Sequence, residues 1–205
     1  MKVLIVDDHA VVRQGMQRLL GPIPGATIIE AATAGEALDA FRTASPDVVV
    51  LDINLGGSSG LELLQRLLME NSSARIVMFS MHAEPLYAAR AISAGAYGYV
   101  SKSAPAEELA VAVKRAAAGE RYIDRDLACD LAFTALSADD PLQKLSTREI
   151  EILRLLADGK SLSGIASTLG IAYKTAANSC SRLKDKLGLE RTADLIRFAL
   201  ENRQI

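Results

Sequence analysis

The sequence predicts an α/β protein in which a doubly wound, five-stranded parallel sheet is followed by a small all-α domain. Apolar runs of strand length alternate with amphipathic, helix-like segments through residues 1–120, as in a parallel sheet covered by helices on both faces. The strand pattern then stops, and residues 142–205 show only helical periodicity. Half of the 205 residues are hydrophobic and only 4% are aromatic, which favours helix-rich packing over a β-sandwich.

The third strand of the predicted sheet is the segment Asp-Val-Val-Val-Leu-Asp at residues 47–52. Because this run does not alternate between apolar and polar residues, we expect both of its faces to be buried. Leucines at helical spacing between residues 61 and 68 predict a helix that covers one face. Asp52 therefore lies at the carboxyl end of a buried strand, the edge at which open α/β sheets bind ligands.

Four further strands and their helices accompany this segment. The predicted strands are residues 3–6, 27–31, 75–79 and 97–100. Helical patterns cover residues 11–20, 35–44 and 105–118. Pro105 in the first turn of the last helix and Gly119 just after it are typical of helix ends. Residues 120–133 predict one more helix, and the small and acidic residues 134–141 predict a linker.

The second part of the chain predicts four helices. They cover residues 146–157, 162–169, 172–187 and 192–201. Ser146 and Glu149 form a capping-box pattern at the start of the first helix, and Gly170 predicts a tight turn between the second and third. A helix, a glycine-containing turn and another helix make up a helix-turn-helix pattern. The expected organisation is a first domain at 1–120, a linker helix and linker at 121–141, and a second domain at 142–205.

The two parts of the chain differ in charge. Residues 1–141 carry 12 Lys and Arg against 18 Asp and Glu, whereas residues 142–205 carry 11 against 7, which gives −6 and +4. The basic part is suited to a polyanionic partner. No apolar run approaches the roughly 20 residues that span a bilayer, and the early acidic residues interrupt any secretory signal, so we expect a cytoplasmic protein. Cys129 and Cys180 lack metal-ligand or redox spacing and are interpreted as packing thiols.

Five side chains are predicted to meet at one edge of the sheet. Asp7 and Asp8 follow the first strand, Asp52 the third, Ser80 the fourth and Lys102 the fifth. Converging carboxylates repel one another and require a cation, and Mg²⁺ prefers such oxygen ligands. A carboxylate can attack phosphorus to give an aspartyl phosphate, while a metal ion and a lysine neutralise the developing charge. Helix capping explains any one of these residues, but the five together predict a phosphoryl site.

These residues, together with the block 145–187, resemble a two-component response regulator of the NarL/FixJ family over essentially the whole chain. The resemblance implies a flavodoxin-like receiver domain followed by a LuxR-type helix-turn-helix. It implies that a sensor histidine kinase phosphorylates Asp52. It also implies that Asp8, Asp52 and the backbone carbonyl of Asn54 hold Mg²⁺ directly, with Asp7 acting through water.

Further roles follow from the same resemblance. Ser80 and Tyr99 match the family's switch pair, in which the hydroxyl turns toward the phosphoryl group and the aromatic ring turns inward. Asn54 and His82 match positions that influence the lifetime of the phosphoryl group, because they flank the path of an attacking water. From the residues alone, Tyr99 is an ordinary strand residue and His82 an ordinary exposed histidine.

The helix at 172–187 is expected to be the recognition helix. Its candidate DNA-binding residues are Lys174, Thr175, Ala177, Asn178, Ser181, Arg182 and Lys184. Asn and Arg can read base edges, whereas Lys and Arg can also neutralise phosphates without reading sequence. Ala177 and Ser179 replace residues that are commonly basic or His in the family, and Ser163-Gly164 replaces a frequent Lys-Glu pair. These departures leave open how tightly the domain binds DNA.

The resulting interpretation is a phosphorylation-dependent, DNA-binding transcriptional regulator rather than an enzyme. Its expected partners are a sensor histidine kinase, promoter DNA and a second copy of the chain, with RNA polymerase as a further candidate and no membrane. The last helix presents apolar residues that either core packing or a dimer face explains; they are Leu195, Ile196, Ala199 and Leu200.

Two alternatives remain open. In the first, the helix-turn-helix of a receiver protein mediates protein contacts instead of DNA binding. The second is a Mg²⁺-dependent phosphatase that forms an aspartyl phosphate. Such an enzyme expects an Asp-x-Asp motif near the first strand, whereas Asp52-Ile53-Asn54 lacks the second carboxylate and lies on the third strand.

Overall fold

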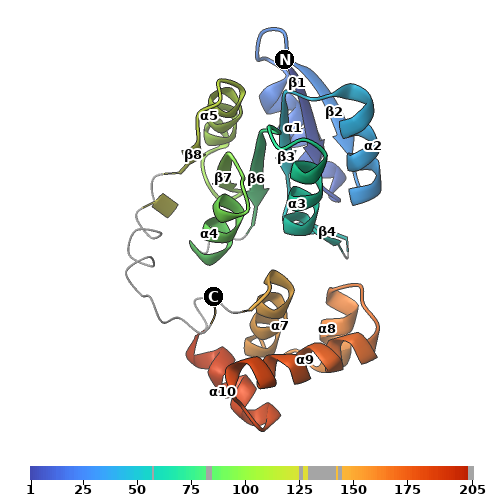
Figure 1. Ribbon diagram of the computed structural model, residues 1–205, viewed down its shortest axis with the longest axis vertical. Helices are drawn as coiled ribbons and strands as arrows, with labels where there is room; N and C mark the ends of the chain where they lie inside the picture. The colour runs from blue at the N-terminus through green and yellow to red at the C-terminus, as the bar shows by residue number, and fades with distance from the viewer. Residues whose placement is uncertain (57, 82–84, 125–126, 129–141, 143–144, 203–205) are drawn as a thin grey trace. The chain divides into compact units, whose positions relative to one another are not determined.

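The computed structural model describes residues 1–202 except 57, 82–84, 125–126, 129–141 and 143–144. The chain divides into two compact units, residues 1–134 and 135–205. The first is a parallel sheet with helices on both sides, and the second is helical (Figure 1).

The first unit contains a six-stranded parallel sheet with the strand order β2-β1-β3-β6-β7-β8. The strands are β1 (Lys2–Val6), β2 (Thr27–Ala31), β3 (Val48–Leu51), β6 (Ile76–Ser80), β7 (Gly98–Ser101) and β8 (Tyr122–Ile123). The helices are α1 (Ala10–Leu20), α2 (Ala34–Ala44), α3 (Gly60–Glu70), α4 (Pro85–Ser93) and α5 (Ala106–Ala117). Because α1 packs beside α5 and α2 beside α3 on opposite faces (Figure 1), the predicted doubly wound architecture is confirmed.

The register of the sheet aligns the carboxyl ends of its central strands. Val6 of β1 lies opposite Leu51 of β3, and Leu51 lies opposite Met78 of β6. The side chains of β1 from residue 3 onward and all of those of β3 are buried, as expected for strands that are covered on both faces. The residues that follow β1 and β3 therefore emerge next to one another at one edge.

The predicted number of strands and the predicted helix at 120–133 are wrong in part. Tyr122–Ile123 forms the sixth strand, β8, whose Tyr122 N–H donates to the Tyr97 carbonyl at 2.8 Å. The open edge of β7 offers unpaired backbone groups, and Gly98 has no side chain to block the Tyr122 carbonyl. Most of the remaining predicted helix, and the predicted linker 134–141, lie outside the described residues.

A second, smaller difference lies in the loop after β3. There, β4 (Asn54–Leu55) pairs antiparallel with β5 (Ser58–Ser59), and sequence patterns gave no signal for such short strands. This pair lies between Asp52 and α3, so it shapes the loop that follows the candidate phosphoacceptor.

The second unit consists of α7 (Thr147–Ala157), α8 (Leu162–Thr168), α9 (Tyr173–Leu187) and α10 (Thr192–Glu201). Its helices pack as α8 on α9 and as α7 on both α9 and α10. Leu153, Ile165, Leu183 and Leu195 are fully buried and form its core. The predicted helix-turn-helix is thus confirmed as a packed unit. In the described part of the chain, no helix is both long enough and apolar enough to cross a membrane.

The start of α7 is tied to the end of α9 by an ion pair. The Ser146 hydroxyl accepts from the Glu149 N–H, the Glu149 carboxylate accepts from the Ser146 N–H at 2.6 Å, and the predicted capping box is confirmed. The same carboxylate lies 2.8 Å from Lys186 Nζ. Burial alone would raise the pKa of Glu149, but the hydrogen bonds from Lys186 and Ser146 hold it below its ordinary value of 4.5.

We predict that Glu149→Ala lowers the free energy of unfolding by about 1–3 kcal/mol at pH 7, because it removes a charge-assisted hydrogen bond and a helix cap. A depressed carboxylate pKa stabilises the fold above the unfolded-state pKa, and this contribution is lost as the pH falls through the folded-state value. The difference from wild type should therefore shrink below about pH 4.5. Urea denaturation followed by circular dichroism measures it, with exposed Glu190→Ala as the control. A pH-independent difference would contradict the ion-pair account.

Candidate functional site

The ends of β1 and β3 carry a cluster of carboxylates. Asp7 follows β1 and is fully buried, and Asp52 follows β3 with 5% of its surface exposed. Asp8 lies beside them and is exposed. The carboxylate oxygens of these three residues and a ring nitrogen of His9 all lie within 4.8 Å of one another. The parallel register thus brings together the three acidic residues that the sequence placed at this edge.

Lys102 joins this cluster from the turn after β7. Its Nζ lies 2.6 Å from Asp7 Oδ2 and 2.6 Å from Asp52 Oδ2, and only 8% of its side chain is exposed. A single buried ammonium therefore bridges two buried carboxylates.

Backbone contacts hold the acidic residues in place. The Asp52 N–H donates to the Val6 carbonyl at 2.9 Å, and Asp7 Oδ1 accepts from the His9 N–H at 2.8 Å. At Gly60, a Cβ atom would collide with the Asp52 carbonyl, so only glycine lets the start of α3 pass this close to the strand end. The position of Asp52 thus depends on the strand before it and on a glycine after it.

The electrostatics of the cluster is a balance between burial and pairing. Burial raises the pKa of Asp52 above its ordinary value of 3.8; Lys102 opposes this rise, and the nearby Asp7 carboxylate adds to it. Burial alone would lower the pKa of Lys102, but the ion pairs with Asp52 and Asp7 raise it above 10.5. The Lys102 ammonium therefore stays charged, and any further cation would stabilise the ionised form of the Asp52 carboxylate.

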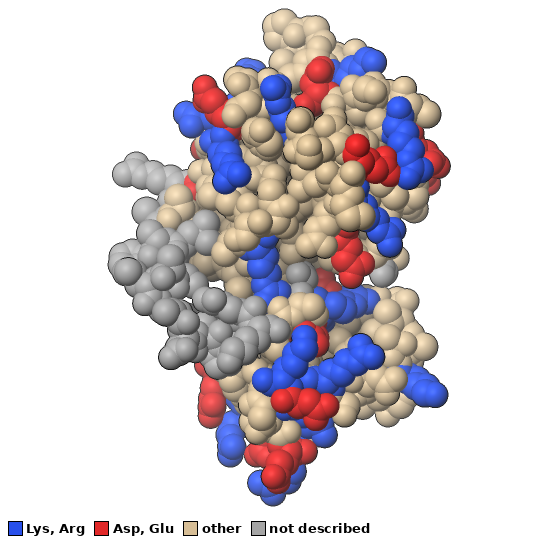
Figure 2. Space-filling model, viewed as in Figure 1, with Lys and Arg blue, Asp and Glu red and all other residues tan. Residues whose placement is uncertain are grey.

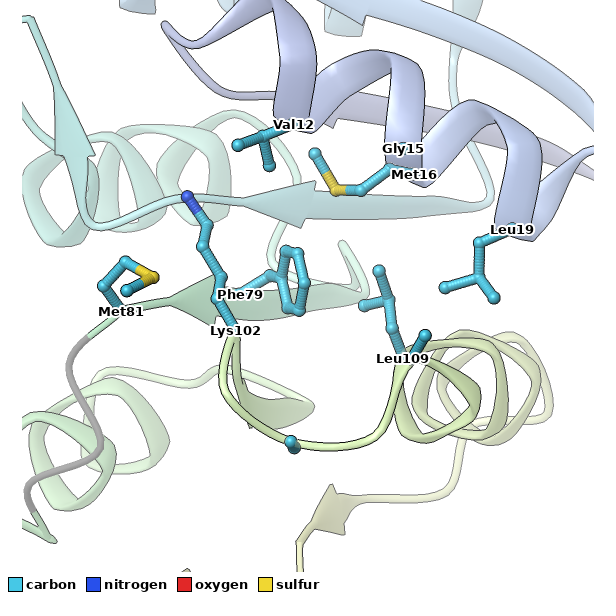
Figure 3. A pocket seen from close by; sticks show the side chains of 10 residues that line it. Val12, Gly15, Met16, Leu19, Phe79, Met81, Lys102 and Leu109 are labelled. Carbon is cyan, nitrogen blue, oxygen red and sulfur yellow. The ribbon is translucent and has the colours of Figure 1, made fainter.

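An apolar cavity of about 370 Å³ adjoins Lys102 between α1 and α5. It is lined mainly by aliphatic, methionine and aromatic side chains, among them Val12, Met16, Phe79 and Leu109 (Figure 3). The Lys102 ammonium lies 5.8 Å from the centre of the Phe79 ring. The apolar wall keeps water from the lysine stem and leaves its charged end beside the carboxylates.

The donor set of this edge fits a hard divalent cation. Three carboxylates with oxygens close together are the ligands that Mg²⁺ prefers, and the exposed position of Asp8 provides an entry path from solvent. The Asn54 backbone hydrogen-bonds to the Asp52 carboxylate, which places the Asn54 peptide next to the cluster.

The two candidate switch residues lie on neighbouring strands. Ser80 ends β6 with 1% of its surface exposed, and Tyr99 in β7 is fully buried. Ser80 lies opposite Ser101, and its carbonyl accepts from the Lys102 N–H at 2.7 Å. Ser80 is therefore joined through the backbone to the lysine of the cluster.

The chain contains two histidines, His9 and His82. His82, singled out in the sequence, lies outside the described residues. His9 was not singled out, yet its Nδ1 lies 2.7 Å from Asp8 Oδ1 and 3.4 Å from Asp7 Oδ1. Its position directly after Asp7-Asp8 was the available signal.

The helix α9 presents most of the predicted DNA-binding residues to solvent. Those that are exposed are Lys174, Thr175, Asn178, Ser181 and Arg182, whereas Ala177 and Lys184 are half-buried. Lys184 Nζ donates to the Glu190 carbonyl at 3.4 Å, so part of its hydrogen-bonding capacity is used within its own unit. On the face of this unit that Figure 2 shows, basic side chains lie among acidic and uncharged ones.

The opposite side of α9 faces the core of the unit. Ala176, Cys180 and Leu183 are buried there. Burial raises the pKa of the Cys180 thiol, which disfavours the reactive thiolate and agrees with a packing role. Cys129 lies outside the described residues.

Comparison with known proteins identifies both units. Residues 3–114 match the response regulator receiver domain, and residues 143–199 match the luxR family of bacterial regulatory proteins. A receiver sheet followed by a LuxR-type helix-turn-helix defines the class of DNA-binding response regulators. Members of this class are transcriptional regulators and are generally not enzymes. The chain belongs to the NarL/FixJ family of this class.

Relatives match along nearly the whole chain. The chain is 37% identical over 199 residues to the methanol utilization control regulatory protein MoxX of Paracoccus denitrificans, covering 96% of this chain and 89% of MoxX. It is 39% identical over 204 residues to the DNA-binding transcriptional activator DevR/DosR of Mycobacterium tuberculosis, covering 98% of this chain and 94% of DevR/DosR. A crystal structure of a LuxR-family two-component response regulator from Aurantimonas matches with a TM-score of 0.64 and 39% identity, covering 66% of this chain and 97% of that one.

We predict that the carboxyl group of Asp52 titrates above its ordinary pKa of 3.8 in metal-free protein, because burial disfavours its charge. Lys102→Met should raise this pKa further, and saturating Mg²⁺ should lower it. Carboxyl ¹³C NMR titration measures the pKa of Asp52 in the metal-free wild type, in Lys102→Met and at saturating Mg²⁺. Lys114→Met, in an exposed lysine, is the control. An unchanged titration in Lys102→Met would show that the bridging contact does not govern the charge of Asp52.

Proposed function

We propose that the chain accepts a phosphoryl group on Asp52 from a sensor histidine kinase and, in the phosphorylated state, binds promoter DNA through α9 in the cytoplasm. The observation that carries the proposal is the bridging of two buried carboxylates by the buried Lys102 ammonium, 2.6 Å from each, at one edge of the sheet. A structural ion pair needs one carboxylate for one ammonium. The surplus of negative charge, with Asp8 beside it, fits a site that receives a cation and a phosphoryl group.

The chemical step forms one bond and breaks another. An oxygen of the ionised Asp52 attacks phosphorus, and the bond from phosphorus to the donor's leaving group breaks, so the leaving group departs with the electron pair. Asp8, Asp52 and the backbone carbonyl of Asn54 would hold Mg²⁺, with Asp7 acting through water. When bound, the ion supplies positive charge for the phosphoryl oxygens.

Lys102 has two successive partners in this proposal. Before phosphorylation its ammonium balances Asp7 and Asp52. After phosphorylation Asp52 has become an acyl phosphate, and the ammonium is free to donate to a phosphoryl oxygen while it keeps Asp7. Because Lys102 is nearly buried, this contact forms in a low dielectric environment, where charge-assisted hydrogen bonds are strong.

Ser80 and Tyr99 are the proposed switch. The Ser80 hydroxyl would turn toward the phosphoryl group, and Tyr99 would fill the space that is released. Such a change shifts the population of states only if the phosphoryl group binds one state better than the other. The backbone hydrogen bond between Lys102 and Ser80 supports a direct link between the site and β6.

We also propose that Asn54 and His82 influence the lifetime of the phosphoryl group. Both would flank the path of a water that attacks phosphorus. His82→Ala should then change the rate of dephosphorylation without changing Mg²⁺ affinity. Phosphate release after removal of the donor measures this rate, and equal rates in the two proteins would reduce His82 to a surface residue.

DNA binding is assigned to the exposed face of α9. Asn178 and Arg182 carry groups that can read base edges, and Lys174 can neutralise a phosphate. On α8, Ser163 and Gly164 offer no positive charge, so the positive charge of the two helices rests mainly on α9. That departure supports the alternative of a protein-binding helix-turn-helix, and the DNA titration below decides between them.

A second copy of the chain is the proposed partner on DNA, with RNA polymerase as a further candidate. On α10, Leu195 and Ala199 are buried in the core, whereas Ile196 and Leu200 are 37% and 48% exposed. These two side chains are the large exposed apolar residues of α10, and we propose them as part of the pairing surface. Two linked helix-turn-helix units would bind half-sites about one helical turn apart.

We predict that Mg²⁺ and acetyl phosphate add one phosphoryl group to the wild type and none to Asp52→Asn, because Asp52 is the proposed acceptor. Intact-mass spectrometry detects the adduct. Asp47→Asn, in an exposed carboxylate just before β3, is the matched control and should be modified like the wild type. The same adduct on Asp52→Asn would make the assignment wrong.

We further predict that phosphorylation raises the affinity for promoter DNA and that this affinity falls steeply with salt, because phosphate contacts release counterions. Lys174→Ala and Arg182→Ala should each weaken binding and reduce the slope of log K against log salt by about 0.9 per lost phosphate contact. Titration of labelled DNA at several salt concentrations measures both effects, with Arg197→Ala on α10 as the control. Identical affinity with and without phosphorylation, or no salt dependence, would favour the protein-binding alternative.

A further inference from the structure

The apolar cavity between α1 and α5 is larger than the gaps that side-chain packing usually leaves. Its volume is about 370 Å³, whereas close-packed protein interiors contain few voids larger than a water molecule. Val12, Met16 and Leu19 of α1 and Leu109 of α5 surround the space beside the Phe79 ring (Figure 3). The packing of the receiver unit therefore leaves room for a small guest molecule.

The mouth of the cavity lies beside Gly15 and Met81. Gly15 is exposed, and 70% of the surface of Met81 is exposed. A Cβ atom at Gly15 would meet no atom within 4 Å, so α1 contributes backbone but no side chain at this point. Met16 and Leu109, in contrast, are buried. A guest molecule can thus enter from solvent and reach buried side chains.

The walls of the cavity favour an aromatic guest. The Phe79 ring can pack against a second ring, and the thioethers of Met16 and Met81 make favourable contacts with aromatic rings and adapt to their shape. An apolar cavity of roughly 150 Å³ is large enough to bind benzene. At about 370 Å³, this cavity has room for one ring with a substituent.

The charge at one end of the cavity favours a neutral guest. Among the described residues that line it, Lys102 alone is charged. Its ammonium donates to Asp7 and Asp52, 2.6 Å from each, which leaves one of its three N–H groups for a further acceptor. An anion would add to the surplus of carboxylates, and a cation would lose its hydration against apolar walls. A hydroxyl oxygen can accept from the ammonium without either cost.

We propose that this cavity binds a small neutral molecule with one aromatic ring and a hydroxyl group. The ring lies between α1 and α5, and the hydroxyl faces Lys102. Such a ligand would be a second chemical input to the receiver unit, in addition to phosphorylation of Asp52. Its binding requires neither phosphorylation nor DNA.

The experiment uses three probes that share one ring and differ in charge: benzyl alcohol, benzoate and benzylamine. NMR titration of ¹⁵N-labelled, full-length protein measures their affinities, and the amide signals of Gly15 and Leu109 locate the bound ring. Gly15→Leu places a side chain at the mouth of the cavity. Gly35→Leu, in an exposed glycine of α2, is the matched control, and leucine suits a helix better than glycine in both variants.

We expect benzyl alcohol to bind wild-type protein and Gly35→Leu with a dissociation constant on the order of 1 mM, a value that suits so small a ligand. Gly15→Leu should bind it about tenfold or more weakly, because the new side chain occupies the space of the ring. Benzoate and benzylamine should each bind wild type more weakly than benzyl alcohol. Circular dichroism checks that both variants are folded.

Three results would overturn the proposal. The first is the absence of saturable binding of benzyl alcohol to the wild type, and the second is equal binding to Gly15→Leu. The third is tighter binding of benzoate than of benzyl alcohol. A second copy of the chain is the other candidate for this apolar face, and sedimentation velocity tests it. A dimeric wild type that binds no probe, with a monomeric Gly15→Leu, would assign the face to the second copy instead.

Phosphorylation by acetyl phosphate, measured on the same samples, separates this inference from the proposed function. If Asp52 were phosphorylated but no probe bound, only the cavity site would be wrong. If benzyl alcohol bound as expected but Asp52 accepted no phosphoryl group, the cavity site would stand and the proposed function would fail.

Discussion

The bridge from Lys102 to Asp7 and Asp52 is the interaction on which the rest of the receiver unit depends. Two buried carboxylates within reach of one ammonium leave a net negative charge in a partly buried site. Removing Lys102 would leave both buried carboxylates without their cation, which costs several kcal/mol. The bridge also requires the ends of β1, β3 and β7 to coincide, so it depends on the parallel register of the whole sheet.

The same bridge explains how chemistry and conformation can be coupled. Lys102 has its ammonium in the cluster, its stem against Phe79 and the apolar cavity, and its backbone N–H on the Ser80 carbonyl. In the proposed function, a change of partner at the ammonium would therefore act on the end of β6 and on the residues beside α1 and α5. Because side chains pack closely around the aliphatic part of Lys102, its surroundings favour discrete conformations over gradual adjustment.

The helix-turn-helix unit follows a different design, in which one helix carries both the core and the surface function. Ala176, Cys180 and Leu183 pack inward, while the polar residues of α9 point outward, and the Lys186–Glu149 ion pair fixes the end of this helix to α7. The orientation of the exposed face is thus set by buried contacts. In the proposed DNA complex, the uncharged residues at 163, 164 and 177 would leave the attraction to DNA phosphates to a few basic side chains of α9.

The sequence by itself determined the alternation of strands and helices, the capping box and the order of the acidic residues. These features follow from local periodicity and from residue types that play the same local role wherever they occur in a protein. Only the tertiary structure decided that Tyr122–Ile123 pairs with β7, because two residues carry no period and depend on an open edge and on Gly98. It also decided that Leu195 is core and Ile196 is surface, and that His9 turns its nitrogen toward Asp8. These features depend on which residues lie next to one another in three dimensions, and the spacing of residues along the chain does not specify those neighbours.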